Sequence, residues 1–167
     1  MAISDHVRMK GYPLIQLFGP DGQEKDRRDC SNLLVYLGME VVAAKLVEGA
    51  MPVPDNNPEI TEYAFRYIGV GEGTTDPTVD DVALESELSP RKSITDSVFK
   101  PDSKPALTTM VALFEKGEST GALTEAGIFV TSTGDTLTNR VTFPVLNKEP
   151  EDILQIAWRL TFDDGKG

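Results

Sequence analysis

The segment that most constrains the fold is "DILQIAWRLTF" at 152–162, in which apolar residues occupy every second position along most of its length. Apolar side chains with a period of two are typical of a β-strand that buries one face. We expect this strand to point Leu154, Ile156, Trp158, Leu160 and Phe162 inward and Gln155, Arg159 and Thr161 outward. The sequence therefore predicts at least one long strand with a well-defined core face.

Shorter segments of the same kind recur along the chain. Strands are predicted at 61–71, 91–100, 106–118, 123–132 and 136–148, with turn residues between several of them. Residues 12–28 are predicted to form a hairpin, in which "GPDG" makes the turn and the polar second strand is exposed. About eight strands with short connections and few helices are typical of an antiparallel β-sandwich. We therefore expect one mainly β domain at 12–167, a jelly-roll-like sandwich.

The best candidate for a helix in this chain is the segment 29–48, "DCSNLLVYLGMEVVAAKLVE". Asp29 or Ser31 can cap its first turn, and Gly49 can end it. Its apolar residues form a broad stripe, so we expect this N-terminal helix to pack on a sheet. The segment that follows, 51–59, holds three prolines and two asparagines and is predicted to be a loop.

The charge balance of the chain excludes two classes of partner. There are 27 acidic and 16 basic residues, which gives a formal net charge of −11. Such a surface repels the phosphates of nucleic acids and of anionic lipids, so we expect no nucleic-acid and no membrane partner. Residues 1–11 are polar and lack the apolar core of a signal peptide. We expect them to form a flexible or partner-bound arm on a protein made in the cytoplasm.

The stretch "YIGVGEGTT" places three glycines directly after a predicted strand: Gly69, Gly71 and Gly73. The next segment, 78–88, is predicted to be a short helix because a threonine can cap its first turn. Strand, glycine loop and helix also build nucleotide sites. Here, however, Thr74 replaces the required sixth-position glycine, no lysine is present, and the nearby charges are acidic. We therefore assign the loop no ligand and expect its glycines to serve a positive φ or close packing against a neighbouring chain.

Residues that could carry catalysis are few. His6 is the only histidine and Cys30 the only cysteine, so one chain can build neither a zinc site from these residues nor a disulfide. Cys30 lies near a predicted helix start, which can lower a thiol pKa, but no histidine is near it in the sequence. We expect no catalytic residues, no cofactor and no metal. The weaker alternative is a calcium site built from Asp76, Asp80 and Asp81 or from Asp163 and Asp164.

Three aromatic residues share one face of the strand predicted at 61–71: Tyr63, Phe65 and Tyr67. A core face or a contact between subunits is the first interpretation of this group. The alternative interpretation is an exposed aromatic platform, which would make the chain a small carbohydrate-binding module on a sandwich scaffold.

Three longer segments carry a resemblance to a known group of proteins. They are "SNLLVYLGMEVVAAKL", "YIGVGEGTTDPTVDDVALESELSPRK" and "GALTEAGIFVTSTGDTLTNRVTFPVLNKEPEDILQIAWRLTF". In their order and spacing they resemble small virion proteins of tailed bacteriophages, related to the leading domains of tail-collar fibre proteins. The resemblance covers about residues 29–162, and the predicted hairpin at 12–28 also fits it.

The resemblance implies a structural part of the virion that self-associates as a ring or trimer, docks to other virion proteins and performs no catalysis. The sequence contains no shaft or receptor-binding tip, so we expect a stand-alone part of the neck, collar or tail. A capsid decoration protein on the head surface is the alternative within the same class. We expect the arm at 1–11 and the hairpin at 12–28 to reach a neighbouring subunit in the particle.

Overall fold

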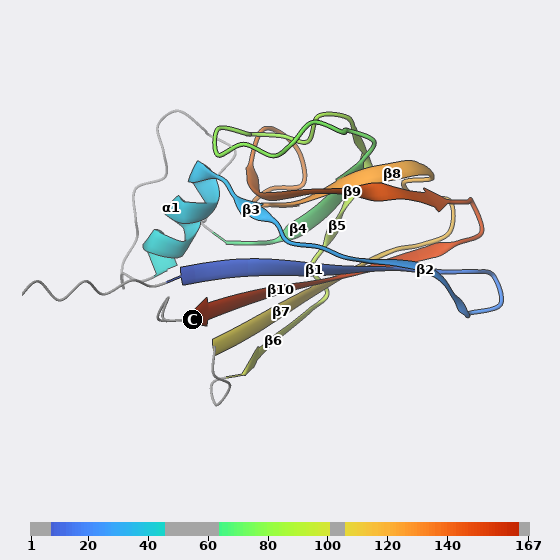
Figure 1. Ribbon diagram of the computed structural model, residues 1–167, viewed down its shortest axis with the longest axis horizontal. Coiled ribbons are helices and arrows are strands. Elements are labelled where there is room, and N and C mark those ends of the chain that lie inside the picture. Colours follow the sequence, from blue (N-terminus) through green and yellow to red (C-terminus); the bar gives the residue numbers. More distant parts are fainter. Residues whose placement is uncertain (1–7, 46–63, 101–105, 164–167) are drawn as a thin grey trace, which may run out of the picture.

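The structure is a computed structural model, and it describes residues 8–45, 64–100 and 106–163. These residues form two antiparallel five-stranded sheets and one helix (Figure 1). Sheet A has the strand order β2 (Glu24–Asp29), β1 (Arg8–Phe18), β10 (Ile153–Asp163), β7 (Ala106–Phe114) and β6 (Asp96–Lys100). Sheet B has the order β3 (Leu33–Leu34), β9 (Leu137–Lys148), β8 (Gly121–Phe129), β4 (Tyr67–Gly71) and β5 (Glu87–Ser93). The prediction of a mainly β, antiparallel chain is confirmed.

The alternation in the last strand produces the core face that the sequence predicts. In β10 the side chains of Leu154, Ile156, Trp158 and Leu160 are buried, whereas Arg159 is exposed. Strand β10 lies between β1 and β7, and its register with β1 runs without a shift from Arg8↔Asp163 to Phe18↔Ile153. A central strand with a continuous register fixes which side chains of its neighbours face the core.

One apolar core lies between the two sheets, which form two layers in Figure 1. It contains residues of β1, β7 and β10 from sheet A together with residues of β4, β8 and β9 from sheet B. Trp158 is fully buried in this core, and its indole Nε1–H donates a hydrogen bond to Oδ1 of Asn32 at 3.3 Å. Burial of each large apolar side chain contributes roughly 1.5–3 kcal/mol, so this shared core holds the layers together.

The prediction of a helix at 29–48 is wrong in its first two turns. Asp29 ends β2, and Leu33 and Leu34 form β3, which pairs with β9. The helix α1 begins only at Tyr36 and is described to Lys45. The earlier residues are extended because their backbone groups bond to strands; for example, the Asn32 N–H donates to the Gly11 carbonyl. The rest of that prediction and the loop predicted at 51–59 lie outside the described residues.

The short helix predicted at 78–88 is also wrong, since this segment holds only turns and bends before β5 begins at Glu87. Thr78 does behave as a cap, but of a single turn: its N–H and hydroxyl donate to the carboxylate of Asp81 at 3.0 and 2.7 Å. Asp81 also accepts a hydrogen bond from the distant Arg140 guanidinium at 2.8 Å. Tertiary contacts therefore override the local helix signal.

Several strand boundaries differ from the prediction, and the described residues form ten strands where about eight were predicted. Strand β1 begins at Arg8, so the predicted arm at 1–11 loses its last four residues to the sheet, and residues 1–7 lie outside the description. The strand predicted at 91–100 is two strands, because the chain passes from sheet B to sheet A at Ile94 and Thr95. The hairpin predicted at 12–28 is confirmed as β1 and β2, with Gly22 at a φ of 77° in its turn.

The helix α1 lies against β9 of sheet B at a point where Gly38 is buried. A Cβ atom at Gly38 would collide with the Thr138 carbonyl oxygen and with the Leu34 side chain, so the close approach of helix and strand requires glycine. Within the described ranges, no helix is long and apolar enough to cross a membrane.

Candidate functional site

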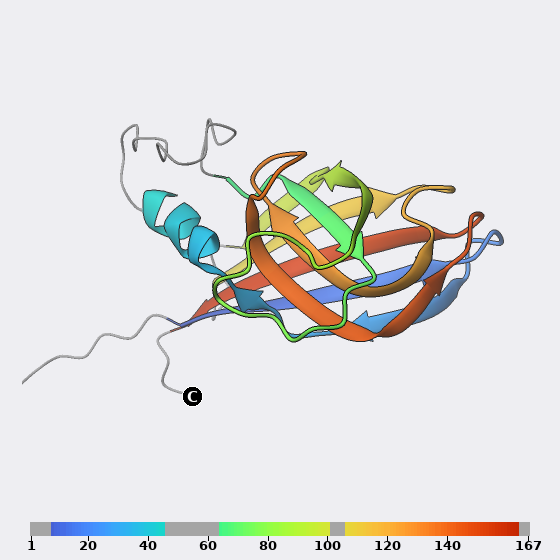
Figure 2. The ribbon, with the colours of Figure 1, turned by 90° about the horizontal axis from the view of Figure 1, so that it is seen from above.

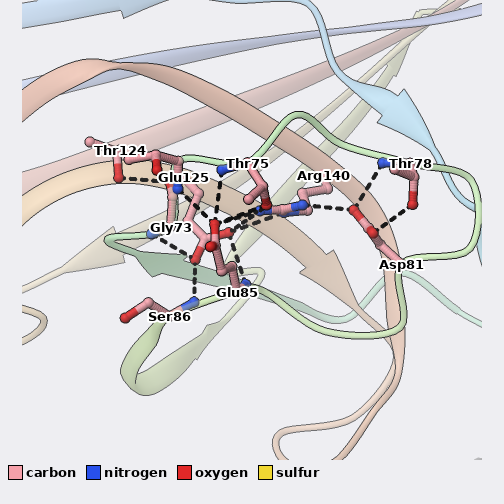
Figure 3. Close-up of polar contacts among 10 residues, drawn as sticks. Gly73, Thr75, Thr78, Asp81, Glu85, Ser86, Thr124, Glu125 and Arg140 are labelled. Atoms are coloured by element: carbon pink, nitrogen blue, oxygen red, sulfur yellow. Dashed lines mark hydrogen bonds and ion pairs between the residues drawn. The ribbon is translucent and has the colours of Figure 1, made fainter.

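The most unusual polar group of the structure is the carboxylate of Glu125, which lies on β8 with 0% of the residue exposed. Its Oε1 accepts hydrogen bonds from the backbone N–H groups of Gly73 and Ser86 at 3.1 and 2.7 Å. Its Oε2 accepts one from the N–H of Glu85 at 3.1 Å. Figure 3 shows these donors converging on the carboxylate from the segment 72–86. The chain thus wraps a short loop around one of its own anions.

Arg140 supplies the counter-charge from β9, the neighbouring strand, and is only 3% exposed. Its guanidinium lies 3.0 Å from Oε2 of Glu125 and 2.8 Å from Oδ2 of Asp81. Gly127 of β8 is the register partner of Arg140, so Glu125 occupies the diagonal position on the same sheet face. Two adjacent strands therefore bring the buried acid and base together, and the guanidinium reaches on to the covering loop.

A second carboxylate fixes the middle of the loop. Oε2 of Glu85 accepts hydrogen bonds from the N–H groups of Thr74 and Thr75 at 2.8 and 2.9 Å and from the Thr75 hydroxyl at 2.9 Å. The base of the loop is closed by a hydrogen bond from the Glu72 N–H to the Ser86 carbonyl at 2.9 Å. We call residues 72–86 the covering segment, because they lie over β8 and β9 on the side of sheet B that faces away from sheet A (Figures 1 and 3).

The three glycines of the sequence stretch have a steric role that the structure identifies. Gly69 and Gly71 lie within β4, and only Gly73 belongs to the loop that follows. A Cβ at Gly73 would lie 2.5 Å from Oε1 of Glu125, and one at Gly71 would lie 2.6 Å from the same atom. None of the three glycines has a positive φ. The predicted close packing of Gly71 and Gly73 is therefore against this chain's own carboxylate, Gly69 packs against the Phe129 ring, and the predicted positive φ is wrong.

The electrostatics of the cluster favour its ionised form. Burial by itself raises the pKa of Asp81, but hydrogen bonds from Arg140 and Thr78 outweigh burial and hold that pKa below its ordinary value of 3.8. The pKa of Glu85 is lowered chiefly by the hydrogen bond from the Thr75 N–H. Burial alone would lower the pKa of Arg140, yet hydrogen bonds to Asp81 and Glu125 raise it above its ordinary value. The cluster is thus a structural anion cradle whose anion is a side chain.

Of the three candidate subunit contacts, the two that the structure describes, Phe65 and Tyr67, do not form an exposed platform. Phe65 packs against the shared core, and Tyr67 packs against a buried cluster that includes Leu84 and Phe129. Both line a largely apolar pocket of about 660 Å³, together with residues of α1, β7 and β10. Tyr63 lies outside the described residues. A role for these aromatic residues in subunit contacts stays a prediction.

The structure describes some of the remaining candidate catalytic and metal-binding residues and not others. Cys30 is half-buried, and burial raises the pKa of its thiol, which makes a reactive thiolate unfavourable. His6 and Asp164 lie outside the described residues, as does the side chain of Asp163. Among the residues described, no group of three or more histidine, cysteine, aspartate or glutamate side chains could hold a metal ion. Asp81, one of the proposed calcium ligands, instead pairs with Arg140.

A second candidate surface is the face of sheet A that points away from sheet B, which we call the open face. Leu14, Ala157 and Val111 lie side by side across β1, β10 and β7 on this face. By the same register it also carries Tyr12, Phe18, Val98, Leu107, Leu113 and Ile153. The covering segment lies on the outer side of sheet B and α1 contacts β9 at the end of the sandwich, whereas no described helix covers the open face (Figures 1 and 2).

The sequence holds a signal for the open face that the predictions did not use. In "YPLIQLF" and "ALTTMVALF" apolar residues occupy both odd and even positions, so both faces of these strands are apolar. Strands of this kind are normally covered on both sides. The inner faces of β1 and β7 pack in the core. Their outer faces are also apolar, so a covering partner is expected for them as well.

Comparisons of this chain with known protein families, with curated proteins and with solved structures found no match.

We predict that Glu125→Gln will lower the free energy of unfolding by about 3–5 kcal/mol, because it leaves the buried Arg140 guanidinium without its full counter-charge. The measurement is urea denaturation at neutral pH. The matched control is Glu151→Gln, since Glu151 is exposed and pairs only with Lys116 at the surface, and its cost should be below about 1 kcal/mol. Equal losses in the two variants would contradict the structural role of Glu125.

We also predict that the stability gap between the wild-type chain and Asp81→Asn depends on pH. The folded-state pKa of Asp81 lies below 3.8, so its ionised form contributes stability above that pH and loses it as the pH falls through the folded-state value. The gap should therefore be full at neutral pH and shrink in acid below about pH 4. Denaturant titrations of both proteins across this range provide the test, and a gap that widens in acid would contradict it.

Proposed function

We propose that this chain is a non-enzymatic structural subunit of a tailed-phage particle, located in the neck, collar or tail. In this proposal it associates with copies of itself, as a ring or trimer, and docks to other virion proteins. The observation that carries the self-association is the apolar open face of sheet A. We also propose that the two sheets form a jelly-roll-like sandwich.

The open face supports an assembly role because of its composition. Its central row, Leu14, Ala157 and Val111, is apolar across three adjacent strands, with Leu14 and Val111 partly exposed and Ala157 buried. In the next row Tyr12 and Val98 are 40% and 43% exposed, and Arg159 and Thr109 lie between them. Apolar surface bordered by polar residues is characteristic of protein–protein contact sites. Symmetric homo-oligomers are the commonest way in which a soluble chain covers such a surface.

The covering segment supports the absence of catalysis. Both carboxylate oxygens of Glu125 accept hydrogen bonds from the chain itself, and the Arg140 guanidinium is shared between Glu125 and Asp81. A catalytic acid or base needs a geometry that reaches a substrate proton. This buried pair instead holds a loop in place, which is what a structural protein requires of it.

The phage assignment rests on the sequence resemblance, and the structure gives its segments a physical meaning. Glu125 comes from the "GALTEAGIF" segment, Arg140 from "NRVTF", and their loop partners from "GEGTTDPTVDDVALESEL". The motifs that carry the resemblance are therefore the residues that hold the covering segment on sheet B. A decoration protein of the capsid surface is the alternative within the same class, and the position of the chain on the particle separates the two.

We predict that the wild-type chain is oligomeric and that Val111→Lys shifts it toward the monomer, because a charge would be placed in the middle of the open face. Sedimentation velocity over a range of concentrations measures this shift. The matched control is Val145→Lys, since Val145 is 47% exposed on β9 in the other sheet and should leave the oligomer unchanged. A monomeric wild-type chain at all concentrations would contradict the self-association.

The location in a particle needs a separate experiment. Antibodies raised against this chain should label intact phage particles at the neck, collar or tail in electron micrographs. Labelling spread over the head surface would favour the decoration protein, and particles that contain none of the chain would contradict a virion role.

A further inference from the structure

The two sheets end in four edge strands, and three of them are protected against pairing with another chain. Strand β2 is "EKDRRD", which carries a charge at every position, and β3 is only two residues long. Strand β5 contains Pro90 and has a shift in its register with β4. Charges, short length, proline and bulges are the devices by which proteins block edge-to-edge association.

The fourth edge strand, β6, has fewer of these devices, since its only charged residues are Asp96 and Lys100, one at each end and of opposite sign. Its five residues, "DSVFK", pair with β7 without a register shift, and none of them is proline. All five are exposed, including Val98 at 43% and Phe99 at 64%. In Figure 1 this strand lies at the rim of sheet A, away from the covering segment. An exposed edge strand with regular pairing is a template for one more strand.

We propose that β6 pairs in antiparallel fashion with β6 of a second copy of this chain, so that two five-stranded sheets A join into one continuous sheet. This inference rests on the self-association proposed above and adds a two-fold contact, which joins one subunit of a ring or trimer to a subunit of another and does not itself close the ring. It predicts a two-fold contact in which the same strand is used by both subunits.

The charges of β6 favour this occupant and this direction. When two β6 strands pair antiparallel about Val98, Asp96 lies opposite Lys100 of the partner subunit, and the symmetry creates that ion pair twice. A parallel pairing in the same register would place aspartate against aspartate and lysine against lysine. The strand is thus self-complementary in the antiparallel direction, which matters for a chain whose net charge of −11 otherwise opposes association.

The pairing also extends the open face. The register of β6 with β7 places Val98 beside Thr109 on the open face, so the two Val98 side chains would meet at the centre of the joined sheet. Two edges of five residues bury less than the roughly 1,600 Å² of a standard stable interface. The strand contact therefore sets the register and the direction, and the joined open faces supply apolar area for further subunits.

A charge-swap series tests the proposal. Asp96→Lys and Lys100→Asp each place like charges opposite one another twice in the self-pair, and each should weaken association about tenfold in sedimentation velocity. The double variant Asp96→Lys/Lys100→Asp should recover the wild-type affinity. A mixture of the two single variants should associate more strongly than either alone, because their β6 strands are complementary to each other. Asp80→Lys, the same charge change on an exposed residue of the covering segment, is the control.

Amide hydrogen exchange on the unaltered chain gives an independent measurement. Protection of residues 96–100 should increase with protein concentration as the strands pair. Single variants that associate like wild type, with exchange at 96–100 independent of concentration, would overturn the strand pairing. If Val111→Lys still dissociates the oligomer in that case, the proposed function stands without this contact. A wild-type chain that is monomeric throughout would instead remove the self-association itself.

Discussion

The arrangement of sheet B depends on one buried interaction, the hydrogen-bonded ion pair between Glu125 and Arg140. A carboxylate excluded from water is costly unless donors surround it. Here the donors are the guanidinium and three backbone N–H groups of the covering segment. The loop has no regular secondary structure between Gly71 and Glu87, so these bonds take the place of a strand ladder. Once they form, Leu84 is buried against Phe129, and the outer side of sheet B is closed.

The two sheets therefore differ in how their outer faces are covered. The outer face of sheet B is covered by the covering segment of its own chain, whereas sheet A presents apolar residues of β1, β7 and β10 that no described helix covers; α1 lies at the end of the sandwich, where it contacts β9. The glycine stretch, which first suggests a ligand site, belongs to sheet B and its covering segment. The surface that the proposed function uses is the open face of sheet A, on the opposite side of the molecule. A chain with one covered and one uncovered side is suited to stacking or ring formation. The proposed assembly role depends on this property.

The parts of the fold that local patterns determine could be predicted from the sequence. The alternation in 152–162 placed the core face of β10 correctly, and the "GPDG" turn placed the β1–β2 hairpin. The start of α1 could not be predicted, because the residues before it bond to Gly11 and β9, which are distant in the sequence. The absence of a helix at 78–88 could not be predicted either, because Asp81 pairs with the distant Arg140. For the same reason the glycines suggested an anion cradle, but Glu125, 52 residues beyond Gly73, could not be identified as its anion.

The central claim is that a buried carboxylate holds the covering segment as firmly as a strand. Native-state amide hydrogen exchange tests it most directly, because Gly73, Glu85 and Ser86 each donate their N–H to Glu125. The account predicts that these three amides exchange as slowly as the core amides of β8, while the exposed Asp76 and Asp80 of the same loop exchange fast. Fast exchange at all five positions would show that the loop opens freely, and would contradict the claim.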